Sequence, residues 1–406
     1  MLKLAYYKSN LSTNNMKDKQ IEKLIKEEEK RQKSVINLIA SENIVSDDVL
    51  KALGSKLTNK YAEGYPGRRY YGGNQVVDKV ENLAIARALK LFKLKATEWH
   101  VNVQPLSGSP ANFTVYSALI PMGGKIMGMK LSSGGHLTHG HPASMTGKIW
   151  KSIQFELNGE TEVIDYEALK KLAMTEKPDI IVCGFTAYPR IVDFKKFREI
   201  ADASGSLLHV DMSHFAGLVA GGVYPSPFPY ADSVVTTTHK SLRGPRHALI
   251  FVKKDAREFD KKIDKMIIPG LFGGPHENSI AAVAVALKEA DTPAFKSYAK
   301  QVVKNAKTLA KELQKLGWHI ISGGTDSHLI LMDTWMEGKG LPGKEASTKL
   351  EKAGIIVNMN TIPGDPRGPM DPSGVRLGTC AETTRGKKEI DMVKLAVKMD
   401  KILRGK

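Results

Sequence analysis

The chain has little cysteine and no long hydrophobic run. It holds two cysteines, Cys183 and Cys380, among 406 residues. Both stand far apart in apolar or glycine-rich surroundings, which argues against a disulfide framework and favours a reducing compartment. The longest apolar run, which starts at Ile280, is far shorter than the roughly 20 residues that span a bilayer. The first residues also lack the pattern of a secretory signal. These absences predict a soluble, cytoplasmic protein.

Basic residues outnumber acidic residues. There are 60 Lys and Arg residues against 43 Asp and Glu residues, and the formal net charge is +17. A charge of this sign raises the question of nucleic acid binding. The lysines, however, are scattered along helical stretches, which is typical of solvated helix faces. No zinc-knuckle spacing, RNA-binding sheet motif or aromatic-basic interleaving accompanies them. The sequence therefore predicts no specific nucleic-acid site and leaves two roles for the charge open, attraction of anionic substrates and weak non-specific RNA binding.

Helix-like and strand-like stretches alternate from about residue 75 onward. The strand candidates include KIMGMK, DIIVCGF, SLLHVD, SVVTTT and ALIFVKK. This alternation indicates an α/β fold, with a mostly parallel sheet covered by helices. Long helices from about Ser279 to Leu316 lead into a smaller α/β pattern. We therefore expect an N-terminal helical arm over 1–50, a large domain over 51–290 and a small C-terminal domain over 291–406.

Two ionisable residues follow apolar strands, where ligands gather in open parallel sheets. Lys240 follows SVVTTT, with Arg243 and Arg246 close by. A desolvated lysine near other cations loses its proton more easily, and the neutral amine can form an imine. The alternative is an ordinary surface lysine. Asp211 ends SLLHVD, and its carboxylate could keep a pyridinium nitrogen protonated, which makes a pyridoxal ring an electron sink. The alternative is that Asp211 caps the next helix.

The segment Ser107-Gly108-Ser109 precedes a predicted helix. We expect Pro110 in the first turn, because proline suits the first helical position, where its missing N–H is not needed. The free N–H groups and serine hydroxyls of this turn could bind a phosphate. An ordinary capped helix start would give the same pattern.

Three further segments carry candidate binding residues. His136, in the loop GGHLTHG, could stack on an aromatic cofactor, and no metal site is indicated because further ligands are missing. Glu63 lies among tyrosines in YAEGYPGRRYYGG and is a candidate proton carrier, although an exposed turn is the competing interpretation. Arg376 lies in an apolar strand. Because buried arginines need anionic partners, it would bind either a substrate carboxylate or an internal acidic residue.

Seven segments occur together in this chain, namely LIASENIVS, LTNKYAEGYPGRRYYGG, NVQPLSGSPAN, GGHLTHG, VDMSHFAGL, TTTHKSLRGPR and VNMNTIPGDPR with SGVRLGT. Together they resemble the serine hydroxymethyltransferase family. The resemblance runs in order from about Ile21 to the C-terminus. It implies the aspartate-aminotransferase fold of enzymes that use pyridoxal 5′-phosphate. It also implies reversible transfer of the serine hydroxymethyl carbon to tetrahydrofolate, which gives glycine and 5,10-methylenetetrahydrofolate, in a homodimer with shared active sites.

The resemblance also implies roles for the matching positions. Lys240 would form the imine with the cofactor, Asp211 would pair with the pyridine nitrogen, and His136 would stack on the ring. The other cofactor contacts would come from Ser107, Gly108, Ser109, Thr186, His214, His239 and Gly273, and from Tyr61 and Gly274 of the partner subunit. The substrate would be bound by Ser41, Tyr71, Arg376 and Glu63, the last from the partner subunit, and folate by Leu131, Gly135, Leu137 and Asn360. The catalytic set would be Lys240, Glu63, Tyr71, His239 and Thr238.

Some positions depart from the family pattern. Thr186 stands where a serine is usual and keeps the hydroxyl. His247 and Ala248 replace smaller residues after Arg246, which leaves the geometry of the cofactor loop open. A folate-independent aldolase for threonine-like β-hydroxy amino acids is the alternative function, and a basic RNA-binding protein with an enzyme fold is a third. The complete tyrosine-rich loop and the folate-contacting matches favour the transferase.

Overall fold

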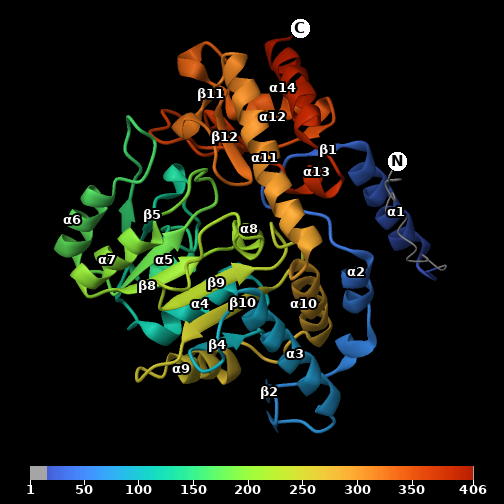
Figure 1. Ribbon diagram of the computed structural model, residues 1–406, viewed down its shortest axis with the longest axis vertical. Helices are drawn as coiled ribbons and strands as arrows, with labels where there is room; N and C mark the ends of the chain where they lie inside the picture. The colour runs from blue at the N-terminus through green and yellow to red at the C-terminus, as the bar shows by residue number, and fades with distance from the viewer. Residues whose placement is uncertain (1–15, 406) are drawn as a thin grey trace.

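The computed structural model describes residues 16–405 and has an α/β fold built on a central sheet (Figure 1). Strands β5 to β9 pair in parallel, while β10 runs antiparallel to both β9 and β4. The prediction of a mostly parallel sheet covered by helices is therefore confirmed. The strands, in spatial order, are β4 Trp99–Asn102, β10 Ala248–Lys253, β9 Ser233–Thr237, β8 Leu207–Asp211, β7 Ile180–Gly184, β5 Lys125–Met129 and β6 Lys151–Phe155.

Strand β7 illustrates why these apolar runs form central strands. Its residues are all buried, because successive side chains face opposite sides of the sheet and both sides are covered. Ile180 and Val182 join the cluster under α4, whereas Ile181 and Cys183 join the larger cluster on the other face. The first cluster is covered by α4 Gly108–Leu119, α5 Met145–Ile149, α9 Phe259–Lys265 and η3 Met266–Leu271, and the second by α3 Gln75–Leu91, α6 Tyr166–Glu176, α7 Phe194–Ser204, α8 Ala216–Ala220 and α10 Glu277–Ala290.

A second, antiparallel sheet lies in the C-terminal part of the chain. Helix α11, Pro293–Lys315, connects the two parts, because Val302 packs in the core of the first sheet and Leu309 in the core of the second. Figure 1 shows this helix running diagonally from the large sheet to the C-terminal elements. The domain boundaries at residues 50 and 290 stay predictions. The C-terminal elements are β11 His319–Ile320, η4 Ile321–Gly323, β12 Leu329–Asp333, η5 Met336–Gly338, α12 Gly343–Lys352, β13 Ile355–Ile356, β14 Asn358–Asn360, β15 Gly374–Gly378, α13 Cys380–Thr384 and α14 Glu389–Arg404.

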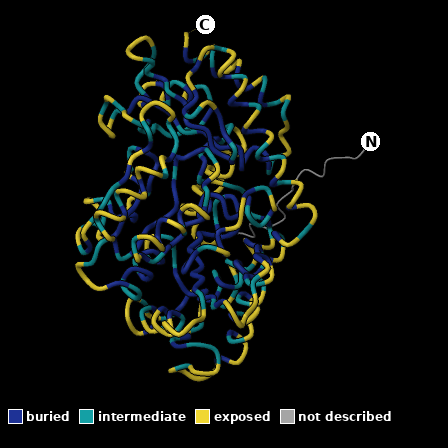
Figure 2. Tube along the Cα trace, turned by 60° about the vertical axis from the view of Figure 1, so that its left-hand side comes forward, coloured by how far each residue is buried: buried dark blue, intermediate teal, exposed yellow. Residues whose placement is uncertain are grey.

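The N-terminal segments reach both parts of the molecule. Strand β1, Ile36–Asn37, pairs in parallel with β13, and α2, Asp47–Leu53, packs against α10. Helix α1, Lys19–Ser34, is capped by Asp18, whose side chain accepts from two N–H groups of the first turn. The apolar face of α1 is exposed, as is much of the outer surface in Figure 2. The short elements before α3 are η1 Lys56–Asn59, β2 Gly64–Tyr65 and β3 Arg68–Arg69, and η2 Leu131–Ser133 follows β5.

The structure bears on two predictions made from composition, those on the cysteines and on membrane-spanning segments. Cys183 and Cys380 are both buried and free. Within residues 16–405, none of the helices combines the length and the apolar character that crossing a membrane requires.

Candidate active site

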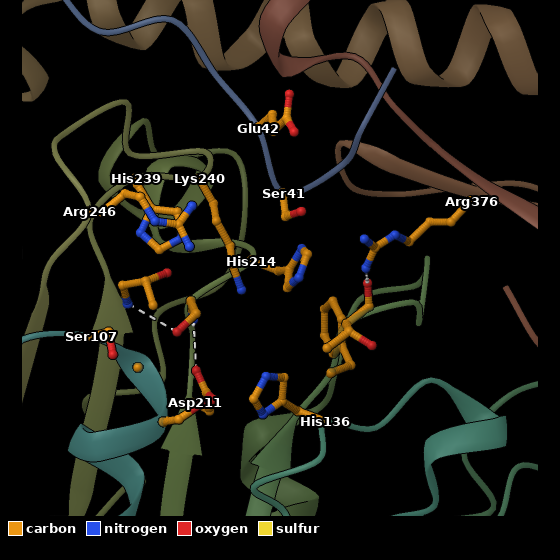
Figure 3. A pocket seen from close by; sticks show the side chains of 16 residues that line it. Ser41, Glu42, Ser107, His136, Asp211, His214, His239, Lys240, Arg246 and Arg376 are labelled. Atoms are coloured by element: carbon orange, nitrogen blue, oxygen red, sulfur yellow. Dashed lines mark hydrogen bonds between the residues drawn. The ribbon is translucent and has the colours of Figure 1, made fainter. Parts of the chain in front are cut away.

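A cavity of about 380 Å³ opens at the carboxyl ends of β7, β8 and β9. Lys240, Asp211, His136, His214 and Arg376 all lie around it in Figure 3, although they come from distant parts of the sequence. The cavity thus gathers most of the residues that the sequence predicted to act together. Its lining consists of Ser41, Glu42, Ser107, Gly108, Ser109, His136, Phe185, Thr186, Asp211, Ser213, His214, Thr237, His239, Lys240, Arg246 and Arg376.

Lys240 lies in the loop after β9, and its side chain extends into the cavity (Figure 3). Two hydroxyl groups hold this loop: Thr238 Oγ1 donates to the Pro245 carbonyl at 2.5 Å, and Ser241 Oγ donates to the His214 carbonyl at 2.6 Å. Thr238 is fully buried and does not line the cavity. Burial lowers the pKa of Lys240 to about 8, and the positive charge of Arg376 adds to this, while Asp211 opposes it. The lysine is therefore far easier to deprotonate than one in water.

Asp211 ends β8 at the base of the cavity. Burial alone would raise the pKa of Asp211, but the hydrogen bond and charge of His139 hold this pKa well below its usual range. The Oδ2 atom of Asp211 accepts from Asn112 Nδ2 at 2.9 Å and lies 3.2 Å from His139 Nε2. Its Oδ1 atom accepts from the Ser213 N–H at 3.1 Å. The next helix, α8, has Phe215 at its N-cap, so Asp211 does not cap that helix as the alternative supposed. The carboxylate is thus held as an anion with one edge available to a ligand.

The segment Ser107-Gly108-Ser109 forms the start of α4. Ser107 is the N-cap residue, and its side chain makes no capping bond, so its hydroxyl is available to a ligand. Pro110 lies in the first turn, as predicted, at the third helical position, because the helix begins at Gly108. The third N–H of a helix also lacks a partner within the helix, so proline is tolerated there as well. A Cβ on Gly108 would lie 2.7 Å from Cγ2 of Thr237, so the close approach of α4 to β9 requires glycine.

Arg376 extends from β15 into the cavity. Its Nε donates to Asn358 Oδ1 at 3.0 Å, and its Nη1 donates to the Thr186 carbonyl at 2.8 Å. Burial lowers the pKa of Arg376 to about 10, and no carboxylate among residues 16–405 opposes that shift. The internal salt bridge considered as an alternative is therefore not formed by these residues. A buried guanidinium without an acidic partner is suited to bind an anionic ligand.

Three histidines in the cavity are neutral at pH 7. Burial lowers the pKa of His136 to about 4 and that of His239 to about 3. Burial and the charge of Lys240 hold the pKa of His214 well below its usual value. His214 Nδ1 lies 3.4 Å from Nε2 of His328, and the two rings are stacked. These imidazoles can therefore pack against or hydrogen-bond a ligand without adding charge.

The tyrosine-rich loop forms a second cluster outside this cavity. The Tyr61 hydroxyl donates to Glu63 Oε1 at 3.2 Å, and the rings of Tyr61 and Tyr71 are 5.0 Å apart. A Cβ on Gly273 would lie 3.2 Å from Glu63 Oε1, and one on Gly274 would lie 3.4 Å from the Tyr61 ring. Tyr61 and Tyr71 are half exposed, at 54% and 48%. The structure thus brings these five predicted residues together, but not with Lys240 of the same chain.

Buried ion pairs hold this loop in place. Arg69 donates to the carbonyls of Ala62 at 2.6 Å and Gly64 at 2.9 Å. The same guanidinium pairs with Asp78 and Glu81 on α3, at 2.8 and 2.9 Å. Because its partners lie on a helix packed against α10, Arg69 attaches the loop to the helical layer.

Comparison with known proteins identifies the family. A family model described as serine hydroxymethyltransferase matches residues 14–399. The chain belongs to the serine hydroxymethyltransferase family. A serine hydroxymethyltransferase of Desulfotalea psychrophila is 54% identical over 386 residues, which cover 95% of this chain and 88% of that protein. Another, from Koribacter versatilis, is 54% identical over 390 residues, covering 96% and 89%. The family resemblance and the fold predicted from the sequence are confirmed.

The residues expected to contact folate in this family do not line the cavity, although Gly135 and Leu137 flank His136, which does. Leu131 begins η2 after β5, and Leu137 is 45% exposed. Gly135 accepts a hydrogen bond at its carbonyl from Thr186 Oγ1 at 2.8 Å. The Thr186 hydroxyl, expected to face the cofactor, is therefore turned toward the main chain. Asn360 ends β14 beside the strand that carries Arg376.

The cavity also has polar groups that fit the family's cofactor, pyridoxal 5′-phosphate. Thr237 Oγ1 and His239 Nδ1 are buried and lack a partner among the described residues, although both residues line the cavity. Buried polar atoms are nearly always paired, so these two indicate a polar ligand. The start of α4 and the ionised Asp211 offer complementary sites for a phosphate and a protonated ring nitrogen.

Sequence reasoning missed several residues that hold the site. Asn112 lies one turn after Ser109 and contacts both Asp211 and His209. His139, in the loop GGHLTHG, was given no role, yet its Nε2 lies 3.2 Å from Asp211 Oδ2. Both stand inside the quoted motifs, so their presence was visible, but their partners are distant in sequence. The departure at His247 is buried, and its Nε2 lies 2.7 Å from the Val103 carbonyl.

Proposed function

We propose that this chain transfers the hydroxymethyl carbon of serine to tetrahydrofolate, reversibly, to give glycine and 5,10-methylenetetrahydrofolate, with pyridoxal 5′-phosphate bound in the cavity. Membership of the family supports this reaction, and so do the homologues that carry the enzyme's name. The observation that carries the proposal is that Lys240, Asp211 and Arg376 line one cavity. These groups supply an amine, an anion and a carboxylate-binding cation.

Each cofactor-binding residue has a defined task. When bound, pyridoxal 5′-phosphate supplies an aldehyde that condenses with amines and a ring that accepts electrons from the amino-acid Cα. Lys240 supplies an amine that is easily deprotonated, and Asp211 holds a proton on the ring nitrogen. Ser107, Ser109 and Thr237 donate hydrogen bonds to the phosphate at the start of α4. His136 packs against the ring and, because it is neutral, adds no charge beside it.

The substrate is positioned by Arg376 and Ser41. The guanidinium binds the amino-acid carboxylate, and its remaining N–H groups are oriented by the bonds to Asn358 and Thr186. Ser41 lines the same cavity and lies between Lys240 and Arg376 in the view of Figure 3. His239 and His214, which are both neutral, donate or accept at the cofactor's polar edge. Leu131, Gly135, Leu137 and Asn360 contact the folate at the cavity mouth.

A second subunit completes the site in this proposal. Tyr61, Glu63 and Tyr71, with Gly273 and Gly274, serve the cavity of the partner, where Glu63 moves a proton near the substrate hydroxyl. The exposure of Tyr61 and Tyr71 supports this arrangement, because a polar aromatic cluster with no cavity of its own is suited to an interface. Exposed apolar side chains on nearby helices support a homodimer, namely Ile21, Leu24, Ile25, Leu50, Val76 and Leu83.

The test is glycine formation from serine with and without tetrahydrofolate. The proposal predicts that folate raises the rate by orders of magnitude, because folate accepts the one-carbon unit. Equal rates would replace it with the folate-independent aldolase. Threonine and allo-threonine serve as control substrates, since cleavage of these amino acids needs no folate.

A further inference from the structure

Asn43 lies between β1 and α2, two residues after Ser41, and does not line the cavity. Its Nδ2 donates to the Lys240 carbonyl at 3.0 Å and to the Tyr298 hydroxyl at 2.8 Å. Its Oδ1 accepts from Thr384 Oγ1 at 2.8 Å and from the Ile44 N–H at 2.9 Å. Both amide protons and both lone pairs are therefore used, which fixes the side chain in a single orientation.

Tyr298 acts on the same carbonyl indirectly, through the two residues that hydrogen-bond to it. The Lys240 carbonyl also accepts from the Arg243 N–H at 3.1 Å. Arg243 has a φ of 66°, in the left-handed region, and its guanidinium lies 4.9 Å from the centroid of the Tyr298 ring. Tyr298 thus contacts both residues that hydrogen-bond to the Lys240 carbonyl, the Asn43 amide through its hydroxyl and the Arg243 guanidinium through its ring. The main chain at Lys240 is held by α11 as well as by the N-terminal segment.

The opposite side of the N-terminal segment touches the strand of Arg376. The Gly378 N–H donates to the Leu38 carbonyl at 2.8 Å. A Cβ on Gly378 would lie 2.3 Å from Cα of Ala40, so the two backbones are in direct contact. Residues 38–43 therefore contact β15 two residues beyond Arg376 and contact Lys240 through Asn43.

We propose that Asn43 is a positioning residue that holds the main chain of Lys240 in register with Ser41 and Arg376. The inference rests on the proposed function, in which the amino group of the substrate would replace the Lys240 amine on the cofactor while its carboxylate binds Arg376. The amino and carboxylate groups of that substrate are a fixed distance apart, so the place of the Lys240 amine relative to the Arg376 guanidinium must be fixed as well. A displacement of about 1 Å can lower a rate by about 100-fold.

Asn43→Asp tests this role, because it replaces the two donors with an anion facing the Lys240 carbonyl. The expected result is a fall of about 100-fold in kcat/KM for serine, together with slower uptake of pyridoxal 5′-phosphate by the cofactor-free protein. The matched control is Asn305→Asp in α11. Asn305 Nδ2 likewise donates to one hydroxyl, that of Thr383, and one carbonyl, that of Lys387, both at 2.9 Å. This control is expected to lower the melting temperature while kcat/KM per folded molecule stays within about twofold.

Asn43→Ala and Tyr298→Phe complete the experiment. Asn43→Ala removes the bonds without adding charge, so it serves if the aspartate variant does not fold, and we expect a loss of about tenfold. Tyr298→Phe keeps the ring under Arg243, and its effect should be less than additive with that of Asn43→Ala, since both act on one carbonyl. Wild-type kcat/KM and cofactor uptake in folded Asn43→Ala would overturn the proposal, as would parallel losses in the Asn305 control. If the wild-type protein itself formed no glycine, the proposed function would fail, while the cofactor-uptake comparison would still test the positioning.

Discussion

Burial sets the charge of each ionisable residue in the cavity, and the outcomes differ. Lys240 and Arg376 both lose affinity for a proton because water is excluded, and burial lowers the pKa of Lys240 to about 8. Asp211 is buried too, but hydrogen bonds from Asn112 and His139 stabilise its charged form. The same loss of solvent therefore yields a reactive amine and a permanent carboxylate side by side.

The lowered pKa of Lys240 makes cofactor uptake depend on pH. Only the neutral amine attacks an aldehyde, so the uptake rate should rise about tenfold per pH unit below pH 8 and level off above it. Stopped-flow absorbance of the cofactor-free protein mixed with pyridoxal 5′-phosphate measures this profile. A rate that continued to rise to about pH 10.4, the ordinary lysine value, would contradict the assignment.

Arg376 is expected to control substrate binding. In Arg376→Ala the carboxylate of serine would enter the cavity without its cation, at a loss of about 2–5 kcal/mol or at least about 30-fold in KM. The measurement is the serine dependence of the rate, with Arg198→Ala as the control. Arg198 forms its ion pair with Asp232, outside the cavity. An unchanged KM for serine would remove Arg376 from the substrate site.

At the level of elements, the site depends on how closely α4 approaches β9. Glycine at position 108 permits this contact, since a Cβ would meet Thr237 at 2.7 Å. Gly108→Ala should therefore move the start of α4 and weaken cofactor binding by about 1–3 kcal/mol. Fluorescence titration of the cofactor-free protein measures the affinity. Gly159→Ala is the matched control, because a Cβ there meets nothing within 4 Å. Equal affinities in both variants would contradict the account.

The sequence allowed the polar residues at strand ends to be predicted, but not the residues that hydrogen-bond to them. Asp211 and Lys240 were identifiable because each is a polar residue that follows an apolar strand. The partners of Asp211, Asn112 and His139, come from a helix and a loop, and no local pattern encodes those contacts. Pro110 lies in the first turn of α4, as predicted, but the helix begins two residues before it, and the sequence did not show this because none of the first three helical positions needs an N–H group.

At the scale of the whole molecule, helix α1 has an apolar face that the described part of the chain leaves exposed. Its apolar residues Ile21, Leu24 and Ile25 are on one face and are 46%, 58% and 42% exposed. The periodicity of a sequence indicates that a helix face is apolar. It does not indicate whether that face is covered by the same chain or by another chain. The tyrosine-rich loop is a second exposed segment of this kind. The cavity that it is proposed to serve belongs to another subunit, which the sequence of one chain does not show.

Mixing two inactive variants tests the shared site. Lys240→Ala subunits lack the amine, and Glu63→Gln subunits lack the proton carrier, so neither homodimer should turn over. After unfolding and refolding in equal amounts, half of the dimers would be hybrids with one intact site each, which gives about a quarter of wild-type activity. Glycine formation and sedimentation velocity are measured together. If the refolded dimers contained one subunit of each variant and still formed no glycine, a shared site would be contradicted.

The most direct test of the account is to locate the lysine that the cofactor modifies. The protein is incubated with pyridoxal 5′-phosphate, reduced with borohydride, digested and mapped by mass spectrometry. We predict one pyridoxyl group per chain, on Lys240, and none in Lys240→Ala. An adduct confined to another lysine, or the absence of any adduct, would contradict the account.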